Sequence, residues 1–361
     1  MCILPMLASV ASRSILDFKM KGSSSGMFTF EEYMEHSLYG TNGFYSKGGS
    51  AGRRAGDFLT SPEVGPLFGE VVAGFMDEVW EDLGQPRQFD FVECGAGPGT
   101  LARSILAAKP KCRGSLNYVA VEISDSQRKL HPSGVVSVRN MPDEPINGII
   151  FANELLDNIP FRLFVFDGKW KEAGVVEDGS GKFIEVLTST SENFDFLPEH
   201  APHGSRVPVQ EQAGRWVQTA VSNLNSGKVI LIDYCSELTT DICNTPWRNW
   251  LRTYKNHERG SHYLNEPGSQ DITTQVVLDQ LRMFVPNLQV ESQSNWLKKY
   301  GIEYLVGEGK KYWEEHRSNP NVLALKMLSR VNEASILMDE LGLGGFMVLT
   351  INSGSDSCLP I

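Results

Sequence analysis

The spacing of apolar residues predicts that strands and helices alternate through the middle of the chain. Short apolar runs, which are typical of buried strands, occur at residues 89–94, 118–123, 135–138 and 148–152. Apolar residues recur at helical spacing over 66–82 and 100–108, and Gly84 and Pro110 follow as stop signals. Because strands that alternate with helices form parallel sheets, we expect an α/β core with helices on both faces.

The pattern changes after residue 160. Residues 161–188 alternate between apolar and polar positions with a period of two, and Asp167-Gly168 and Asp178-Gly179 are typical of hairpin turns. We therefore expect an antiparallel meander inserted beside the sheet. Helix and strand patterns then resume, with helices expected at 209–224, 273–284 and across 302–341, and strands at 229–234, 288–292 and 346–351.

These patterns also indicate how the chain is divided. The Ser-Ser-Ser-Gly stretch at 23–26 is typical of a flexible joint. Thr29 and Glu32, soon after it, have the spacing of a capping box and predict a helix start. We divide the chain into a flexible tail at 1–27, a segment of helix and loop at 28–87, a core at 88–160 and 205–361, a meander at 161–204, and a polar, tryptophan-containing helical insertion at 239–270.

Composition and charge narrow the class of protein. Of the 361 residues, 41% are hydrophobic and 21% charged, which is enough apolar material to bury a sizeable core. The net charge of −11 argues against non-specific electrostatic binding to nucleic acid, so we expect no nucleic-acid partner. No run approaches the roughly 20 apolar residues of a membrane helix, so we expect no membrane insertion. The oligomeric state is not indicated.

The cysteines and histidines predict no metal site. The six cysteines are scattered and form no CxxC pair, unlike the ligands of a structural zinc site or a disulfide framework. His200 and His203 have metal-compatible spacing, but they lie in a Pro-flanked loop with no helix to support them. Scattered free thiols are typical of a reducing compartment, and we therefore predict a cytoplasmic location.

A glycine-rich turn at residues 95–99 is the most informative segment. The sequence Phe-Val-Glu-Cys-Gly-Ala-Gly-Pro-Gly-Thr at 91–100 joins an expected strand to an expected helix. Glycines let a backbone turn tightly and approach a ligand at a helix N-terminus. The spacing is GxGxG, not the GxGxxG of dinucleotide-binding turns, and Pro98 removes an N–H that would otherwise face a pyrophosphate. Glu93, two residues before the first glycine, favours a cationic cofactor.

Acidic residues follow two of the neighbouring strands. Glu122 closes the second strand, where doubly wound folds bind ribose hydroxyls through a carboxylate. Asn153, Glu154 and Asp157 follow the fourth strand and would project over the same edge of the sheet. Two carboxylates and an amide there suit an amine or guanidinium nucleophile. The alternatives are a glycine turn that serves only chain reversal, and helix capping by the Asn and Asp side chains.

These motifs resemble the MidA family of S-adenosylmethionine-dependent methyltransferases, which includes a mitochondrial complex I assembly factor that methylates a protein arginine. Two stretches are specific to that family: Gly-Asp-Phe-Leu-Thr-Ser-Pro-Glu at 56–63, and Pro-Gly-Ser-Gln-Asp-Ile-Thr at 267–273. Cys235 departs from the family, which tends to have Gly after Asp-Tyr. The other stretches that carry the resemblance are 28–39, 43–45, 68–70, 93–101, 152–160 and 232–234.

The resemblance implies a class I, Rossmann-like methyltransferase with a mostly parallel seven-stranded sheet, which binds S-adenosylmethionine and methylates a protein, arginine being the favoured acceptor. It implies that 56–63 closes over the cofactor and substrate. The candidate catalytic residues are Glu154, Asp157 and Glu63. The implied cofactor-binding residues are Glu93, Gly95, Ala96, Gly97, Gly99, Thr100, Leu101, Glu122, Ile123, Met141, Asn153, Thr60 and Pro62. The alternatives are a helix cap at Thr60 or Ser61 and a core role for Met141.

Two other function classes stay open at this stage. One is a nicotinamide-dependent oxidoreductase, against which the missing third glycine of the fingerprint argues. The other is a scaffolding protein that keeps a cofactor fold and grips a partner through its insertions. The stretch from Trp247 to Tyr263 has aromatic and Arg side chains of the kind found at interfaces, although burial inside an insertion explains them equally.

Overall fold

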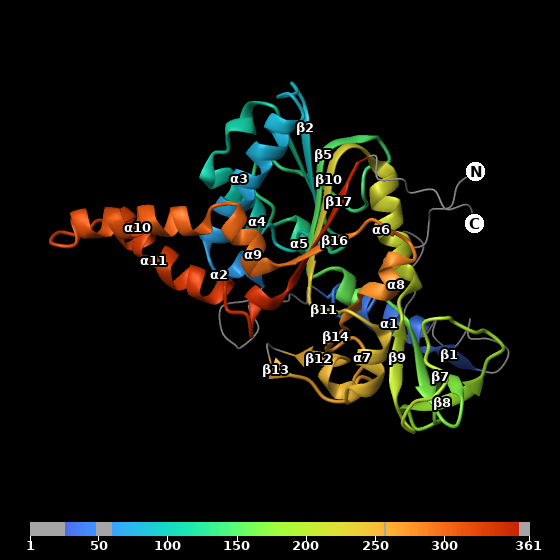
Figure 1. Ribbon diagram of the computed structural model, residues 1–361. Coiled ribbons are helices and arrows are strands. Elements are labelled where there is room, and N and C mark those ends of the chain that lie inside the picture. The colour runs from blue at the N-terminus through green and yellow to red at the C-terminus, as the bar shows by residue number, and fades with distance from the viewer. Residues whose placement is uncertain (1–25, 48–59, 256–257, 354–361) are drawn as a thin grey trace.

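The computed structural model describes residues 26–47, 60–255 and 258–353. Most of the predicted tail and residues 56–59 of the family-specific stretch lie outside the described residues. A seven-stranded sheet forms the centre of the molecule (Figure 1). In spatial order its strands are β16 (Gln289–Ser292), β17 (Met347–Asn352), β10 (Leu224–Asp233), β5 (Ile146–Asn153), β2 (Phe89–Cys94), β3 (Leu116–Val121) and β4 (Val136–Val138).

The central sheet is mixed, because β17 runs antiparallel to both of its neighbours, β10 and β16. The pairs from β10 through β5, β2 and β3 to β4 are all parallel. The carboxyl ends of these parallel strands therefore meet at one edge. The expected α/β core is confirmed, and its last strand is the exception to the parallel pattern.

Helices cover both faces of the sheet, and each face has its own apolar cluster. Phe68, Phe91 and Trp296 belong to the first cluster, and Val217, Ile150 and Leu281 to the second. The predicted helix at 66–82 and strand at 89–94 occur with those bounds. The first face is covered by α3 (Pro66–Asp82), α4 (Thr100–Ala108) and α9 (Gln293–Lys299), and the second by α6 (Glu211–Asn223) and α8 (Leu278–Arg282).

Two glycines allow three strands to approach closely at the end of the sheet away from the carboxyl edge. Gly148 has φ +147°, and a Cβ built on it would lie 2.0 Å from the carbonyl oxygen of Asp90. A Cβ on Gly227, at φ +120°, would lie 1.8 Å from the carbonyl oxygen of Gly148. Both contacts are with backbone, which cannot move aside without opening the sheet.

We therefore expect Gly148→Ala to destabilise the protein by about 3–5 kcal/mol, since steric overlap and an unfavourable φ act together. Urea denaturation of both proteins measures this difference. Gly114→Ala is the matched control, because a Cβ at Gly114 meets no atom within 4 Å and should change the unfolding free energy little. Equal midpoints for the Gly148→Ala variant and the wild type would contradict this account.

A second sheet stands beside the core. It contains the predicted meander, β6 (Arg162–Phe166), β7 (Trp170–Glu177) and β8 (Phe183–Ser189), together with β1 (Met27–Thr29) and β9 (Arg206–Val209). The predicted capping box is present: Thr29 and Glu32 exchange side chain–backbone hydrogen bonds at the start of α1 (Phe30–Tyr39). Apolar residues of α1, including Phe30, pack against this sheet.

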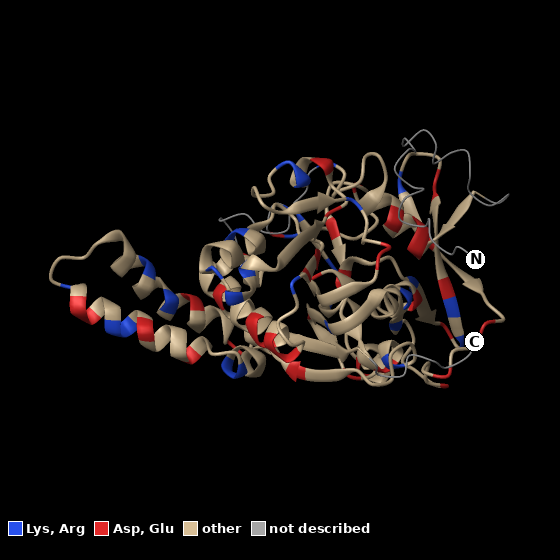
Figure 2. Cartoon of the chain, turned by 90° about the horizontal axis from the view of Figure 1, so that it is seen from above, with Lys and Arg blue, Asp and Glu red and all other residues tan. Residues whose placement is uncertain are grey.

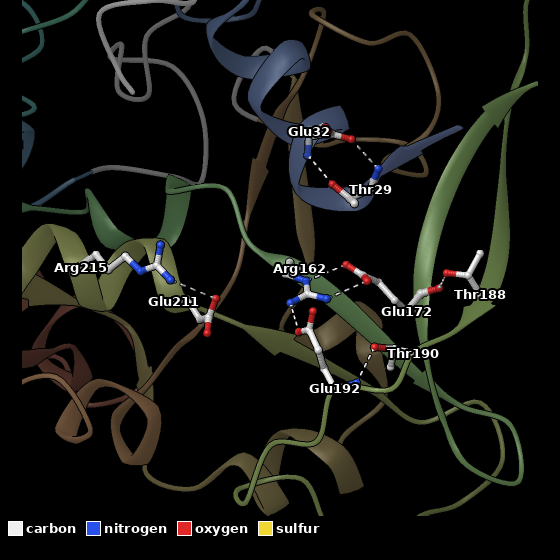
Figure 3. A network of polar contacts seen from close by, with 9 residues as sticks. All are labelled: Thr29, Glu32, Arg162, Glu172, Thr188, Thr190, Glu192, Glu211 and Arg215. Carbon is white, nitrogen blue, oxygen red and sulfur yellow. Dashed lines mark hydrogen bonds and ion pairs between the residues drawn. The ribbon is translucent and has the colours of Figure 1, made fainter. Parts of the chain in front are cut away.

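An arginine fastens the loop that follows the meander to the second sheet (Figure 3). Arg162 donates two hydrogen bonds to Glu172, at 2.7 and 2.8 Å, and a third to Glu192 at 2.5 Å. Its guanidinium also lies over the rings of Phe164 and Phe194. Because the Arg162 and Glu172 side chains are largely buried, this network is less screened by solvent than an exposed pair.

Residues 239–270 are not the helical insertion that we expected. They contain α7 (Thr239–Asn244), followed by β12 (Arg252–Lys255) and β13 (Glu258–Arg259). β12 pairs with β13 and with β14 (Asp271–Thr273), and β11 (Cys235–Ser236) pairs with β15 (Val276–Val277). The predicted helix at 273–284 accordingly begins only at Leu278. Pairing between segments distant in sequence overrides the local pattern here.

Two antiparallel helices form an arm that projects from the core (Figure 1). They are α10 (Ile302–His316) and α11 (Val322–Leu337), and the inner part of the arm packs on α3. Figure 2 shows acidic and basic residues interspersed along the arm. None of the helices in the described ranges is long and apolar enough to cross a membrane.

Candidate active site

The predicted glycine turn lies at the carboxyl edge, between β2 and α4. Gly95, Gly97 and Gly99 have φ values of +72°, +52° and +77°, a conformation that glycine adopts without strain. The N–H groups of Gly95 and Ala96 donate to the carbonyl of Val121 at 3.0 and 3.1 Å, which ties the turn to β3. A Cβ at Gly97 would meet no atom within 4 Å, so a ligand has room to approach the backbone there.

Glu122 joins the glycine turn to the segment after β3. Its Oε2 accepts the Gly97 N–H at 2.9 Å, and its Oε1 accepts the Ser124 N–H at 2.7 Å. The residue is only 8% exposed, so its carboxylate is held in one place. A carboxylate has about four acceptor positions, and those left over suit vicinal hydroxyl groups. Glu122 thus contacts the glycine turn, and its role in binding ribose hydroxyls stays a prediction.

Glu93 lies at the base of the turn, facing the first apolar cluster. Tyr118 donates its hydroxyl to Glu93 Oε2 at 2.6 Å. Burial raises the pKa of Glu93 to about 8, and the hydrogen bond from Tyr118 only partly opposes this. The side chain is therefore mostly protonated at neutral pH until a positive charge is brought near it.

This pKa predicts how stability depends on pH. The folded protein holds the Glu93 proton up to about pH 8, whereas the unfolded chain loses it near the ordinary value of 4.5. Because the folded state binds more protons in that window, its stability falls as pH rises from about 4.5 to 8, by at most about 1.4 kcal/mol per pH unit. We expect Glu93→Gln to flatten this slope in urea denaturation series. Parallel slopes for variant and wild type would contradict the prediction.

Glu154 follows β5 in an unusual backbone conformation. Its φ is +52°, which is uncommon for a residue other than glycine and is often found at functional sites. Its N–H donates to the carbonyl of Ile232 at 2.8 Å, and Asn153 Nδ2 donates to its Oε1 at 2.9 Å. Burial, and then the charge of Asp157, raise the pKa of Glu154 to about 8, while the hydrogen bond from Asn153 and, more weakly, one from the Ser61 backbone oppose the rise.

Asp157 and Asp233 form a pair of carboxyl groups beside Glu154. Asp233 Oδ2 accepts the N–H groups of Leu156 and Asp157 at 3.0 and 3.2 Å, and the Tyr234 hydroxyl donates to Asp157 Oδ2 at 2.5 Å. Burial, and then the neighbouring carboxyl groups, raise the pKa of both aspartates well above the usual range. Asp157 Oδ1 is buried and has no hydrogen-bond partner among the described residues.

A tyrosine from the N-terminal segment reaches the same edge. The Tyr45 hydroxyl lies 3.0 Å from Asn158 Oδ1 and 3.1 Å from Asp271 Oδ2, and Asn158 Nδ2 donates to Asp271 Oδ1 at 3.0 Å. Tyr39 stacks on Tyr45 and donates to the Asn158 carbonyl at 3.0 Å. Burial raises the pKa of Asp271 to about 6. The segment before the core thus covers part of the carboxylate cluster.

The structure brings the predicted residues into two adjoining groups. Leu155 joins them, because a Cβ on Gly95 would lie 3.2 Å from Leu155 Cδ1. The first group is the glycine turn with Glu93 and Glu122. The second is the loop with Asn153, Glu154 and Asp157, and Glu63 lies near enough to raise the pKa of Glu154.

The other predicted cofactor residues have more indirect positions. The Ile123 carbonyl accepts hydrogen bonds from Arg128 and Arg139, and Met141 Sδ lies 3.5 Å from Asn223 Nδ2 on α6. Ala96 and Leu101 are buried in the first apolar cluster. Thr100 opens α4, and Thr60 and Pro62 flank the start of α2 (Ser61–Val64). Thr60 makes no side-chain capping bond.

Sequence reasoning did not select several residues of the carboxylate cluster. Asp233 ends a strand that pairs with β5, so the register of two distant segments brings it beside Glu154. These residues all lie in stretches that carry the family resemblance, namely 28–39, 43–45, 152–160, 232–234 and 267–273, and that position was the signal that could have identified them. The residues missed are Tyr39, Tyr45, Asn158, Asp233, Tyr234 and Asp271.

Comparisons with known proteins identify the family and the fold of the chain. Residues 71–294 match the model of a family of S-adenosyl-L-methionine-dependent methyltransferases. A crystal structure from Burkholderia thailandensis bound to S-adenosyl-homocysteine superposes with a TM-score of 0.77 at 26% identity, covering 93% of this chain and 90% of that chain. A second crystal structure from the same organism gives a TM-score of 0.75 at 25% identity, covering 92% of this chain and 89% of that one.

Curated relatives carry a more specific name. The chain is 26% identical to the mitochondrial protein arginine methyltransferase NDUFAF7 of Mus musculus, covering 80% of this chain and 73% of that protein. It is 27% identical to the Drosophila melanogaster homolog over 70% of this chain, and it spans 65% of that relative's length. Because both relatives are mitochondrial, our prediction of a cytoplasmic location is wrong. Free thiols indicate a reducing environment, but they do not identify the compartment in which a protein resides.

Proposed function

Because this chain belongs to the MidA family of S-adenosyl-L-methionine-dependent methyltransferases, we propose that it transfers a methyl group to an arginine side chain of a protein substrate. The observation that carries the proposal is the pairing of the glycine turn with a buried cluster of carboxyl groups. The order of the seven strands, with one reversed, agrees with the class I, Rossmann-like architecture.

The cofactor fits the residues of the glycine turn. Glu122 would hold the ribose hydroxyls, the backbone of residues 95–99 would line the amino acid part, and Glu93 would face positive charge. When bound, S-adenosylmethionine supplies a methyl group on a sulfonium, ready for displacement at carbon. Met141, Ile123, Thr60 and Pro62 complete the proposed lining.

The acceptor end of the site suits a guanidinium. Glu154 and Asp157 offer oxygens at the carboxyl edge, and Asp157 Oδ1 has no partner among the described residues. A guanidinium donates from a planar fork to carboxylates, and its charge would lower the raised pKa values of these groups. We assign Glu154 to orient the nucleophilic nitrogen and take its proton, Asp157 to hold the second nitrogen, and Glu63 to assist from α2.

Two experiments in sequence test the proposal. Calorimetric titration with S-adenosylmethionine, S-adenosylhomocysteine and NAD should show micromolar binding of the first two only. Transfer of a tritiated methyl group to a peptide library is then measured, with arginine in one set and lysine at the same positions in the other. Label in the arginine set alone is expected. Binding of NAD alone would overturn the cofactor assignment, and label confined to the lysine set would overturn the acceptor assignment.

A further inference from the structure

A buried glutamate of the arm contacts the start of α3. Glu333, on α11, is 7% exposed. Its Oε2 accepts the backbone N–H of Leu67 at 2.9 Å, and its Oε1 accepts the Ser329 hydroxyl at 2.6 Å. Leu67 is in the first turn of α3, whose free N–H groups favour a negative charge. Glu333 therefore provides a hydrogen-bond acceptor for a backbone N–H in the first turn of α3.

Gly65 makes room for this carboxylate. Gly65 is the single residue between α2 and α3, and a Cβ built on it would lie 2.3 Å from Glu333 Cδ and 2.4 Å from Oε2. Any side chain larger than hydrogen would displace Glu333. The junction between the two helices is thus shaped to receive one side chain from a helix that lies more than 250 residues further along the chain.

A second set of hydrogen bonds links α11 to α2 through the side chain of Gln293. The carbonyl of Leu337 accepts from Gln293 Nε2 at 3.3 Å, and Gln293 Oε1 accepts the Ser61 hydroxyl at 2.9 Å. Ser61 and Gln293 are fully buried. The short helix α2 is therefore held from both ends, by Gln293 at its first residue and by Glu333 just past its last.

Ser61 in turn contacts the acceptor site. Its backbone hydrogen bond to the Glu154 side chain favours the ionised form of that carboxyl group and opposes the rise in its pKa. We propose that Glu333 is a positioning residue, which fixes α2 so that the Ser61 backbone stays within hydrogen-bond reach of Glu154. The arm thereby keeps the start of α2 beside the carboxyl group that takes the substrate's proton, a role that rests on the proposed function of Glu154.

The effect is measured first without turnover. In protein labelled with ¹³C-glutamate, the Glu154 carboxyl signal is assigned by its absence in Glu154→Gln and titrated with pH. We expect the Glu154 pKa to rise in Glu333→Ala by less than about one unit, because the Ser61 backbone makes the smallest of the contributions that lower it and one full hydrogen bond to a charged group is the upper bound. Glu333→Gln keeps an acceptor for the Leu67 N–H and should restore most of the wild-type value. Ser335→Ala, at an exposed position on the same helix, is the matched control and should change nothing.

Two further measurements separate positioning from simple stabilisation. The acid limb of the kcat/KM profile should move to higher pH by the same amount in Glu333→Ala, while the dissociation constant of S-adenosylhomocysteine stays within twofold of wild type. If that variant does not fold, two others test the same contacts. Gly65→Ala displaces Glu333, and Ser61→Ala removes the hydrogen bond to Gln293. Both should also raise the Glu154 pKa.

An unchanged Glu154 pKa in folded variants that show faster hydrogen exchange at Leu67 would overturn the proposal, because Glu333 would then be only a helix cap. This outcome differs from failure of the proposed function. In that case the wild-type protein would methylate no peptide, although the titration of Glu154 would still respond to Glu333.

Discussion

Glu154→Gln is expected to lower kcat for methyl transfer by about 10²- to 10⁴-fold, the usual contribution of a positioned general base. Glutamine has nearly the same shape and can keep the hydrogen bond from Asn153, but it cannot take a proton. The backbone of Glu154 is held by its N–H to the Ile232 carbonyl, so the loop should keep its place. Steady-state kinetics with the labelled arginine peptides measure the effect.

The cofactor affinity of the Glu154→Gln variant should stay within about twofold of wild type, since the glycine turn is untouched. Glu144→Gln, at an exposed position on the surface, is the control and should retain full activity. A Glu154→Gln variant that turns over like the wild type would remove Glu154 from the mechanism and shift the role of base to Asp157 or Glu63.

Glu122→Ala is expected to weaken S-adenosylmethionine binding by about 10- to 100-fold. The variant loses charged acceptors worth about 1.5–3 kcal/mol to the hydroxyls of the ligand, where 1.4 kcal/mol corresponds to a factor of ten. It also leaves the Gly97 and Ser124 N–H groups without the carboxylate that orders the turn. Calorimetric titration measures the change.

Glu122→Gln should give an intermediate affinity, because the amide keeps one acceptor but adds a donor that cannot pair with the Gly97 N–H. Glu144→Ala serves again as the exposed control. Wild-type affinity in Glu122→Ala would show that the carboxylate serves only to brace the turn, and the ribose would have to be bound by other groups.

Local patterns were sufficient to predict the core. Apolar residues at helical spacing placed α3, and a fully buried run placed β2, because each element buries a continuous face against the sheet. Thr29 and Glu32 were found for a similar reason, since a capping box is a contact across three residues. In such cases the information that determines the structure lies within a few neighbouring residues.

The insertion and half of the carboxylate cluster depend on distant contacts. Arg252 to Tyr254 form a strand because they pair with Asp271 to Thr273, and no pattern within 239–270 reports that partner. Asp233 faces Asp157 because β10 and β5 are neighbours in the sheet. The residues that sequence reasoning found, Glu154 and Asp157, were those whose own loop carried several polar side chains together.

The reversed strand β17 has a consequence for how the chain reaches this structure. It is the second strand from one edge, between β16 and β10, and Asp233 pairs with Met347, so this side of the sheet forms only through a contact between residues far apart in sequence. Contacts of this kind slow folding, because a long loop must be ordered before they form. During synthesis, β10 therefore has an unpaired and largely apolar edge until the segment around residue 350 has left the ribosome. We expect the nascent chain to be most prone to aggregation during this interval.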